Sequence, residues 1–320
     1  MRMLCIDGGG IRGIIPALVL TELEERTGRR TAEMFDLIAG TSTGAILASA
    51  LARPGDDRTT PRYTARDLLG LYEAEGPEIF DRSLLKRIRS VGGWLDERYD
   101  DTALVAALRR YLDGARLSDA LTDVFITAYE IEERFAFFFR SSRAREDPTY
   151  DFPLADACRA TAAAPTYFEP AKVTDVAGSR SYALIDGGVF AANPSLCAVA
   201  EVARNGDLED VDLVLSLGTG SLTRPLPYAH VRSFGQLEWA RSIVDVVFDG
   251  IADTTEFALE RLLGRDRYVR LQISLDRASD DLDDASPRNM AILREEGARL
   301  LAEQSETVDA LVERLSAAHA

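Results

Sequence analysis

A short apolar segment followed by a glycine-flanked serine constrains the fold of this chain more than any other feature. Residues 35–39 lead into Gly-Thr-Ser-Thr-Gly at positions 40–44, and a run of small and apolar residues follows. The pattern Gly-x-Ser-x-Gly predicts a tight turn from a strand into a helix, because bulkier neighbours would clash there. Such a turn presents the serine hydroxyl at a helix N-terminus, where partial positive charge and N–H groups favour a developing oxyanion. Ser42 is therefore a candidate nucleophile, with an ordinary small-residue turn as the alternative interpretation.

A second strand, glycine loop and helix open the chain. The apolar run 3–6 is followed by Asp-Gly-Gly-Gly-Ile-Arg-Gly at positions 7–13. Apolar residues at helical spacing come next: Ile15, Leu18, Val19 and Leu23. Three consecutive glycines leave backbone N–H groups uncovered by side chains, and a loop of this kind can surround an anion. The N–H groups of Gly8, Gly9 and Gly10 are therefore candidates for an oxyanion hole.

The same loop also fits the dinucleotide-binding pattern. Gly8, Gly10 and Gly13 satisfy Gly-x-Gly-x-x-Gly, which requires an acidic residue at the end of the next strand, about 20 residues on. Glu24 and Glu25 lie within the first predicted helix instead, and the next predicted strand leads into the serine turn. The position that would bind a ribose hydroxyl thus holds a candidate nucleophile, which argues against dinucleotide binding.

An aspartate ends a third apolar run. The segment Tyr-Ala-Leu-Ile-Asp-Gly-Gly occupies positions 182–188, so Asp186 is offered at a strand end and is followed by two glycines that allow another segment to approach. Catalytic groups of open α/β sheets gather at such strand ends. Asp186 is a candidate proton acceptor, and an aspartate in a strand-end turn without a chemical role is the alternative.

Taken together, these three motifs resemble the patatin-like phospholipase family. Its signatures are Asp-Gly-Gly-Gly-x-Arg/Lys-Gly, Gly-x-Ser-x-Gly and Asp-Gly-Gly, and all three are present here in that order. The resemblance continues through residues 160–168, 189–194 and 215–220, so it spans nearly the whole chain. One difference is Ala192, where many relatives carry asparagine before the Asn-Pro pair. This difference affects only a local hydrogen bond.

What the resemblance implies is a lipid acyl hydrolase with a mostly parallel central sheet flanked by helices. Ser42 and Asp186 would form a catalytic dyad, with the oxyanion hole at Gly8, Gly9 and Gly10. Arg12 would either hold a lipid phosphate or carboxylate or brace the loop by binding carbonyls. Lipid is the implied partner, and no motif implies a cofactor or a metal. An acyltransferase with the same site, a phospholipase effector switched on by a signal, and a non-enzymatic lipid-binding module remain alternatives.

The supply of histidines bears on the choice between dyad and triad. The sequence has two, His230 in a proline-broken loop and His319 at the penultimate position, where chain ends are usually poorly ordered. We therefore favour Asp186 over His230 as the base, although a triad is defined by geometry. An unperturbed aspartate, with a pKa near 3.9 against about 6.5 for histidine, starts roughly 3.5 kcal/mol behind as a proton acceptor. Burial of the carboxyl group and a preorganised oxyanion hole are expected to recover this difference.

Composition narrows the remaining choices. The net charge of −16 argues against nucleic-acid binding, which needs a basic surface. No apolar run approaches the roughly 20 residues of a membrane span, and Asp7 interrupts the N-terminal run too early for a secretory signal, so a cytoplasmic protein is expected. The odd number of cysteines predicts buried reduced thiols: Cys5, Cys158 and Cys197. The oligomeric state stays open.

One domain is expected over residues 1–320, with a helical cap or insertion at roughly 53–120. Within it, a basic and amphipathic segment (Arg82, Leu84, Lys86, Arg87, Ile88, Arg89, Val91) precedes Trp94. We interpret its apolar stripe as packing on the core, with transient contact at a membrane surface as the alternative.

Residues 124–126 and 135–139 are predicted to be neighbouring strands. The acidic segment 280–284 lacks the ligand spacing of a calcium loop and is predicted to be a solvated loop.

Overall fold

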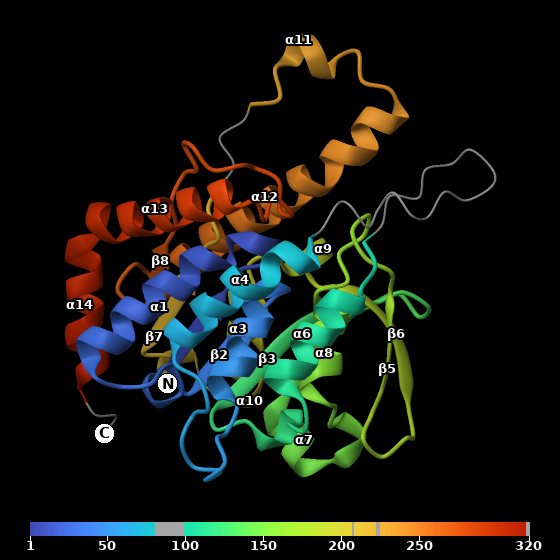
Figure 1. Cartoon of the computed structure of the whole chain (residues 1–320). Helices are drawn as coiled ribbons and strands as arrows, with labels where there is room; N and C mark the ends of the chain where they lie inside the picture. The colour runs from blue at the N-terminus through green and yellow to red at the C-terminus, as the bar shows by residue number, and fades with distance from the viewer. Residues whose placement is uncertain (81–98, 207, 222–224, 318–320) are drawn as a thin grey trace.

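The computed structural model describes residues 1–80, 99–206, 208–221 and 225–317, which form a central sheet between two layers of helices (Figure 1). In this part of the chain eight strands make up the sheet: β1 (Arg2–Ile6), β2 (Leu37–Gly40), β3 (Asp123–Glu130), β4 (Phe135–Arg140), β5 (Ala171–Thr174), β6 (Ser181–Asp186), β7 (Leu213–Leu217) and β8 (Tyr268–Leu271). Their order is β5-β6-β3-β2-β1-β7-β8, with β4 paired to β3. The predicted α/β fold class is confirmed.

Strand direction divides the sheet into two parts. Strands β3, β2, β1, β7 and β8 are parallel neighbours, whereas β4 and β6 run antiparallel to β3, and β5 runs antiparallel to β6. The predicted neighbouring strands at 124–126 and 135–139 correspond to β3 and β4. The carboxyl ends of β1 and β2 therefore lie side by side, which brings the glycine loop next to the serine turn.

The register explains how Asp186 reaches the same level. Gly40 of β2 pairs with Ile126 of β3, and Ala128 of β3 pairs with Asp186. Ala128 lies two positions beyond Ile126 along β3, so Asp186 lies two positions beyond Gly40 along the sheet, near the level of Ser42. The carboxylate thus enters the site from the direction opposite to that of the serine.

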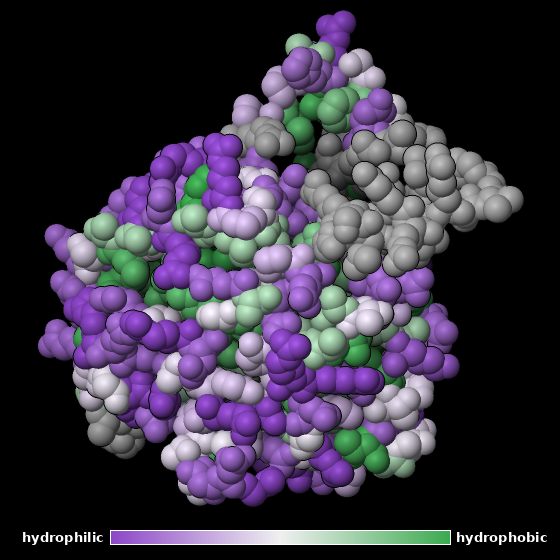
Figure 2. Space-filling view, viewed as in Figure 1, coloured by the Kyte–Doolittle hydropathy of each residue, from purple (hydrophilic) through white to green (hydrophobic). Residues whose placement is uncertain are grey.

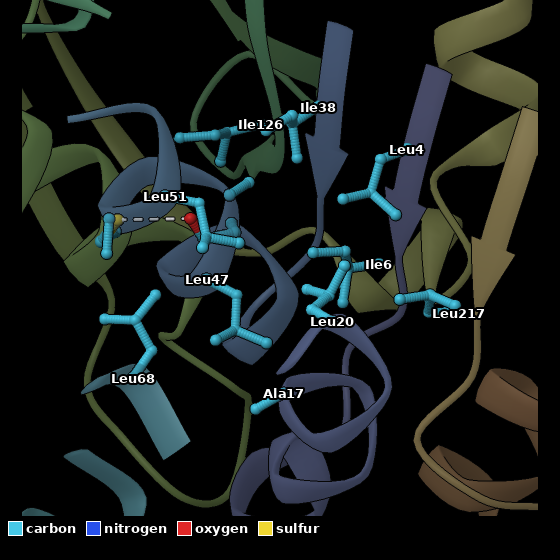
Figure 3. Packing of buried hydrophobic residues seen from close by; sticks show 14 of the residues in the cluster. Leu4, Ile6, Ala17, Leu20, Ile38, Leu47, Leu51, Leu68, Ile126 and Leu217 are labelled. Carbon is cyan, nitrogen blue, oxygen red and sulfur yellow. Dashed lines mark hydrogen bonds between the residues drawn. The ribbon is translucent and has the colours of Figure 1, made fainter. Parts of the chain in front are cut away.

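Each face of the sheet buries its own hydrophobic core. Side chains alternate between the two faces of a strand, so Leu4 and Ile6 join one cluster, while Met3 and Cys5 join the other. In Figure 3, strand residues such as Ile38 point toward the helices that cover the first face. The covering helices are α1 (Ile14–Thr27), α3 (Thr43–Ala52), α4 (Ala65–Ile79), α6 (Thr102–Leu112), α8 (Leu154–Thr161), α13 (Pro287–Glu303) and α14 (Ser305–Ser316) on this face, and α10 (Ser195–Asn205) and α12 (Gln236–Leu263) on the other.

The described chain also contains four short α-helices, α2 (Thr31–Met34), α7 (Ser141–Glu146), α9 (Gly188–Ala191) and α11 (Tyr228–Val231), and four 3-10 helices (Gly10–Gly13, Leu117–Asp119, Pro148–Tyr150 and Leu208–Asp210). The proposed cap region contains α4 and α6, whose buried residues belong to the main core. Its status as an insertion remains a prediction. The basic segment from Arg82 to Val91 and Trp94 lie outside the described residues.

Two predictions about polar and sulfur-containing residues need correction. Cys5 and Cys158 are buried and free as expected, but Cys197 is only partly buried. The acidic segment is not fully solvated, because Asp283 is buried and accepts a hydrogen bond from the Tyr99 hydroxyl at 2.6 Å. Local sequence did not show this contact because the two residues are far apart in the chain.

Among the described helices, none is both long and apolar enough to cross a membrane.

Candidate active site

The serine turn joins β2 to α3 with a strained backbone at Ser42. Ser42 has φ 53° and ψ −121°, and helix α3 begins at the next residue. A positive φ is unfavourable for a residue with a side chain and costs of the order of 1–3 kcal/mol. The flanking glycines are required by close approach: a Cβ atom on Gly40 would lie 2.4 Å from the amide nitrogen of Ala45, and one on Gly44 would lie 2.2 Å from the carbonyl oxygen of Ile6. The predicted turn is therefore present.

Asp186 is buried beside this serine. Its side chain is 1% exposed, and Oδ1 accepts a hydrogen bond from the Gly188 N–H at 2.7 Å. Burial disfavours the charged carboxylate and raises the pKa of Asp186 to about 7, although hydrogen bonds from Gly188 and from the Ser42 side chain lower it. The structure therefore places the two predicted residues at one cavity, close enough for the Ser42 side chain to affect the pKa of Asp186.

The glycine loop uses only part of its N–H groups internally. Gly8 donates its N–H to the Ala192 carbonyl at 3.0 Å, and Ile11 donates to the Leu282 carbonyl at 3.0 Å. The N–H groups of Gly9 and Gly10 make no hydrogen bond to any residue that the structure describes. Gly10 has φ 55°, and a Cβ atom there would lie 2.2 Å from the Leu282 carbonyl oxygen. Two of the three candidate N–H donors are thus open to a ligand.

These groups meet at one cavity with an apolar lining. The space between atoms here is about 750 Å³, a volume that includes open solvent, and Ser42, Asp186, Gly9 and Gly10 all line it. Most of its wall is apolar: Ile11, Ile46, Leu71, Ile79, Phe80, Leu104, Ala162, Ala164, Phe168, Phe248 and Leu282. An apolar cavity with a few convergent polar groups is the usual form of a site for an apolar ligand.

The chain matches known proteins over most of its length. A family model described as patatin-like phospholipase matches residues 4–198. The chain belongs to the patatin-like phospholipase family. Relatives include patatin-like protein 4 of Arabidopsis thaliana, 30% identical over 94% of this chain and 83% of that protein. Patatin-07 of Solanum tuberosum is 31% identical over 94% and 83%, and patatin-like protein 1 of Oryza sativa subsp. indica is 32% identical over 97% and 83%.

Membership gives the general chemistry. Patatin-like phospholipases act on lipids, so lipid hydrolysis is the activity of this family. In this member, the polar groups at the cavity are few and its lining is apolar, which fits a lipid ligand.

Arg12, which belongs to the glycine-loop motif of the family, lies at a different cavity from Ser42 and Asp186. It is 7% exposed and lines a second cavity together with Asp7 and Arg270. Arg270 pairs with Asp7 at 2.6 Å, and both side chains are buried. Among the described residues that line the catalytic cavity, Arg12 is absent. Arg12 therefore does not line the cavity that contains Ser42, and its role, in bracing the loop or in holding a lipid phosphate or carboxylate, stays a prediction.

His230, the histidine that the structure describes, does not lie at the dyad. His230 is exposed on α11 and is not among the described residues lining the cavity. His319 lies outside the described residues. The exposed position of His230 is consistent with a patatin-like dyad that does not use this histidine.

Two threonines hold the serine turn of this patatin-like chain and were not identified from sequence. The Ser42 N–H donates to Thr161 Oγ1 at 2.9 Å. Thr41 Oγ1 donates to the Ala191 carbonyl at 2.6 Å and lies 2.7 Å from Thr127 Oγ1. Thr161 falls inside the segment 160–168 that carried the family resemblance. Its role depends on a contact between residues 119 positions apart, which no local pattern shows.

Proposed function

We propose that this protein hydrolyses carboxylic ester bonds of lipids, with Ser42 as nucleophile and Asp186 as general base. The proposal depends above all on the buried Asp186 carboxyl group, which has a pKa raised to about 7 and lines the same apolar cavity as Ser42. A base is most effective when its pKa lies near the working pH. The roughly 3.5 kcal/mol handicap of an unperturbed aspartate relative to histidine is removed at this pKa.

The first half of the reaction forms an acyl-enzyme. Ser42 Oγ attacks the ester carbonyl carbon while Asp186 accepts the hydroxyl proton. The carbonyl oxygen becomes an oxyanion, which accepts hydrogen bonds from the N–H groups of Gly9 and Gly10. The carbon–oxygen bond to the alcohol then breaks, and Asp186 returns the proton to the departing alkoxide. Gly8 donates its N–H to Ala192 instead, so it shapes the loop.

Water completes the cycle. It attacks the acyl carbon of the ester on Ser42, and Asp186 accepts one of its protons. The second tetrahedral intermediate collapses, the bond to Ser42 Oγ breaks, and Oγ takes the proton from Asp186. The fatty acid leaves, and both residues return to their starting states. The apolar wall of the cavity would hold the acyl chain during both halves.

A substrate panel tests the proposal. Purified protein is incubated with phospholipids, monoacylglycerols and short p-nitrophenyl esters, and released fatty acid or p-nitrophenol is measured against a no-enzyme blank. We expect hydrolysis by the wild type and by a matched control, Ser316→Ala, which alters an exposed serine on α14. Ser42→Ala should be inactive, and a fluorophosphonate probe should label Ser42 in the wild type. Hydrolysis that survives in Ser42→Ala would contradict the assignment.

A further inference from the structure

The outward face of the N-terminal half of α12 is apolar. Trp239, Ile243, Val246 and Val247 follow one another at helical spacing and are 39%, 43%, 41% and 38% exposed. The opposite face of the helix carries Leu259, which is fully buried in the core. Figure 1 shows α11 and this half of α12 rising away from the body of the molecule. Helix α12 thus packs through one side and presents apolar side chains on the other.

Exposed large hydrophobic residues are concentrated in this region. In the described part of the chain nine such residues are exposed, and all but Phe135 fall between positions 226 and 262. Figure 2 shows hydrophobic residues on the projecting part of the molecule, among hydrophilic ones. Contiguous exposed apolar surface usually marks a site that contacts a partner or a membrane.

The same helix forms part of the catalytic cavity. Phe248 follows the apolar group directly in sequence and lines the cavity with Ser42 and Asp186. Its ring packs against Gly188, where an added Cβ atom would lie 2.7 Å from Phe248 Cζ. Gly188 in turn donates its N–H to Asp186. This part of α12 therefore presents Phe248 to the catalytic cavity on one side and the exposed apolar residues on another side.

The charge of this region differs from that of the molecule. Between positions 226 and 247 the sequence has two arginines (Arg232 and Arg241) and two acidic residues (Glu238 and Asp245), so its formal charge is zero. The whole chain carries −16. An anionic lipid surface would repel the molecule, whereas a zwitterionic surface exerts no such repulsion. Trp239 and Tyr228 are also of the residue types enriched at membrane–water interfaces.

We propose that α11 and the outward face of α12, called here the α12 surface (Tyr228, Trp239, Ile243, Val246 and Val247), bind a zwitterionic lipid bilayer. The proposal rests on the proposed function, because Phe248, on the same helix as this surface, forms part of the wall of the proposed lipid-hydrolysing site. Insertion of the apolar side chains at the headgroup boundary would hold the protein on the bilayer from which its substrate comes.

Vesicle binding tests the α12 surface separately from catalysis. Binding is measured by co-flotation with phosphatidylcholine vesicles, and with vesicles containing phosphatidylserine for comparison. The test variant is Trp239→Ser/Ile243→Ser/Val246→Ser, and the matched control is Phe135→Ser, which removes an exposed aromatic residue from β4. We expect the triple variant to bind phosphatidylcholine vesicles at least about tenfold more weakly and to hydrolyse vesicle lipid correspondingly less, because it loses most of the inserted apolar area.

Soluble-ester hydrolysis and melting temperature show whether the triple variant is folded. Both should stay at the wild-type level, and Phe135→Ser should match the wild type in every assay. In a Trp94→Phe background, Trp239 is the remaining tryptophan, and its emission should shift to the blue on binding. Wild-type binding that also persists in the triple variant would overturn the proposal. The proposal would also be overturned if the wild type bound no vesicles but formed a dimer, and the triple variant were a monomer. The α12 surface would then bind a second copy of this chain.

Failure of the proposed function would look different. In that case the wild type hydrolyses neither vesicle lipid nor soluble ester, while the difference in vesicle binding between wild type and triple variant is still measurable. The Ser42→Ala variant provides the same binding measurement without hydrolysis of the vesicles.

Discussion

At the scale of single residues, the burial of Asp186 sets the pH range of activity. The base must be ionised to accept a proton, and its pKa is raised to about 7 by burial. We therefore expect kcat/KM for a soluble ester to be full above this pH and to fall as the pH drops through about 7. A pH profile corrected for buffer hydrolysis measures this. An acidic limb centred near pH 4 would show that the base is an ordinary exposed carboxylate.

The same burial predicts that catalysis costs stability. The pKa of Asp186 in the folded protein lies above its ordinary value. Its favourable contribution to the free energy of unfolding is therefore complete at low pH, where the carboxyl group is protonated, and is lost as the pH rises through about 7. At pH 8, Asp186→Asn removes a buried charge, and stability should rise by at most about 4 kcal/mol. Urea denaturation at pH 8 and at pH 4 measures the change, which should vanish at the lower pH.

Asp113→Asn, which changes an exposed aspartate at the end of α6, is the control for this stability measurement. We expect its effect to be within about 0.5 kcal/mol at both pH values. If Asp186→Asn were destabilising at pH 8, the carboxylate would have to be well solvated or paired in the folded protein, in conflict with its burial.

At the scale of elements, the glycine loop and the serine turn must keep a fixed relative position. A methyl group on Gly9 would lie 2.3 Å from Thr219 Oγ1, so Gly9→Ala should displace the loop and its N–H donors. Loss of one oxyanion donor costs roughly 10²–10³ in kcat. Steady-state kinetics on a soluble ester should show this loss in kcat with little change in KM. Gly70→Ala on α4, where an added Cβ meets no atom within 4 Å, is the matched control. An unchanged kcat with a raised KM would assign the loop to substrate binding.

The serine turn depends on an acceptor from a neighbouring helix. Thr161 at the end of α8 accepts the Ser42 N–H at 2.9 Å and is fully buried. Thr161→Val keeps the shape of the side chain and removes this acceptor, so we expect kcat to fall by about one to two orders of magnitude through misplacement of the nucleophile. Thr161→Ser restores the hydroxyl and should recover most of the activity. Equal kinetics for the valine and serine variants would show that the hydrogen bond does not position Ser42.

At the scale of the whole molecule, the sequence predicted the parts of the site but not all of their arrangement. The turn at Ser42 and the glycine loop were predictable because glycine spacing dictates local backbone geometry. The antiparallel entry of Asp186 was not, since strand direction depends on pairing with β3. Arg12 shares its motif with Gly9 and Gly10 but faces a different cavity. The contact of Leu282 with the glycine loop joins residues 271 positions apart, which periodicity does not reveal.

In the proposed mechanism, a Ser42–Asp186 dyad works without a histidine. The most direct test compares kcat/KM of the wild type, Asp186→Asn and His230→Ala for one soluble ester, with melting temperatures to confirm folding. We expect Asp186→Asn to lose several orders of magnitude, because the amide cannot accept the Ser42 proton. His230→Ala should keep most of its activity, since His230 is exposed on α11. A loss in His230→Ala as deep as that in Asp186→Asn would contradict the dyad and restore a catalytic triad.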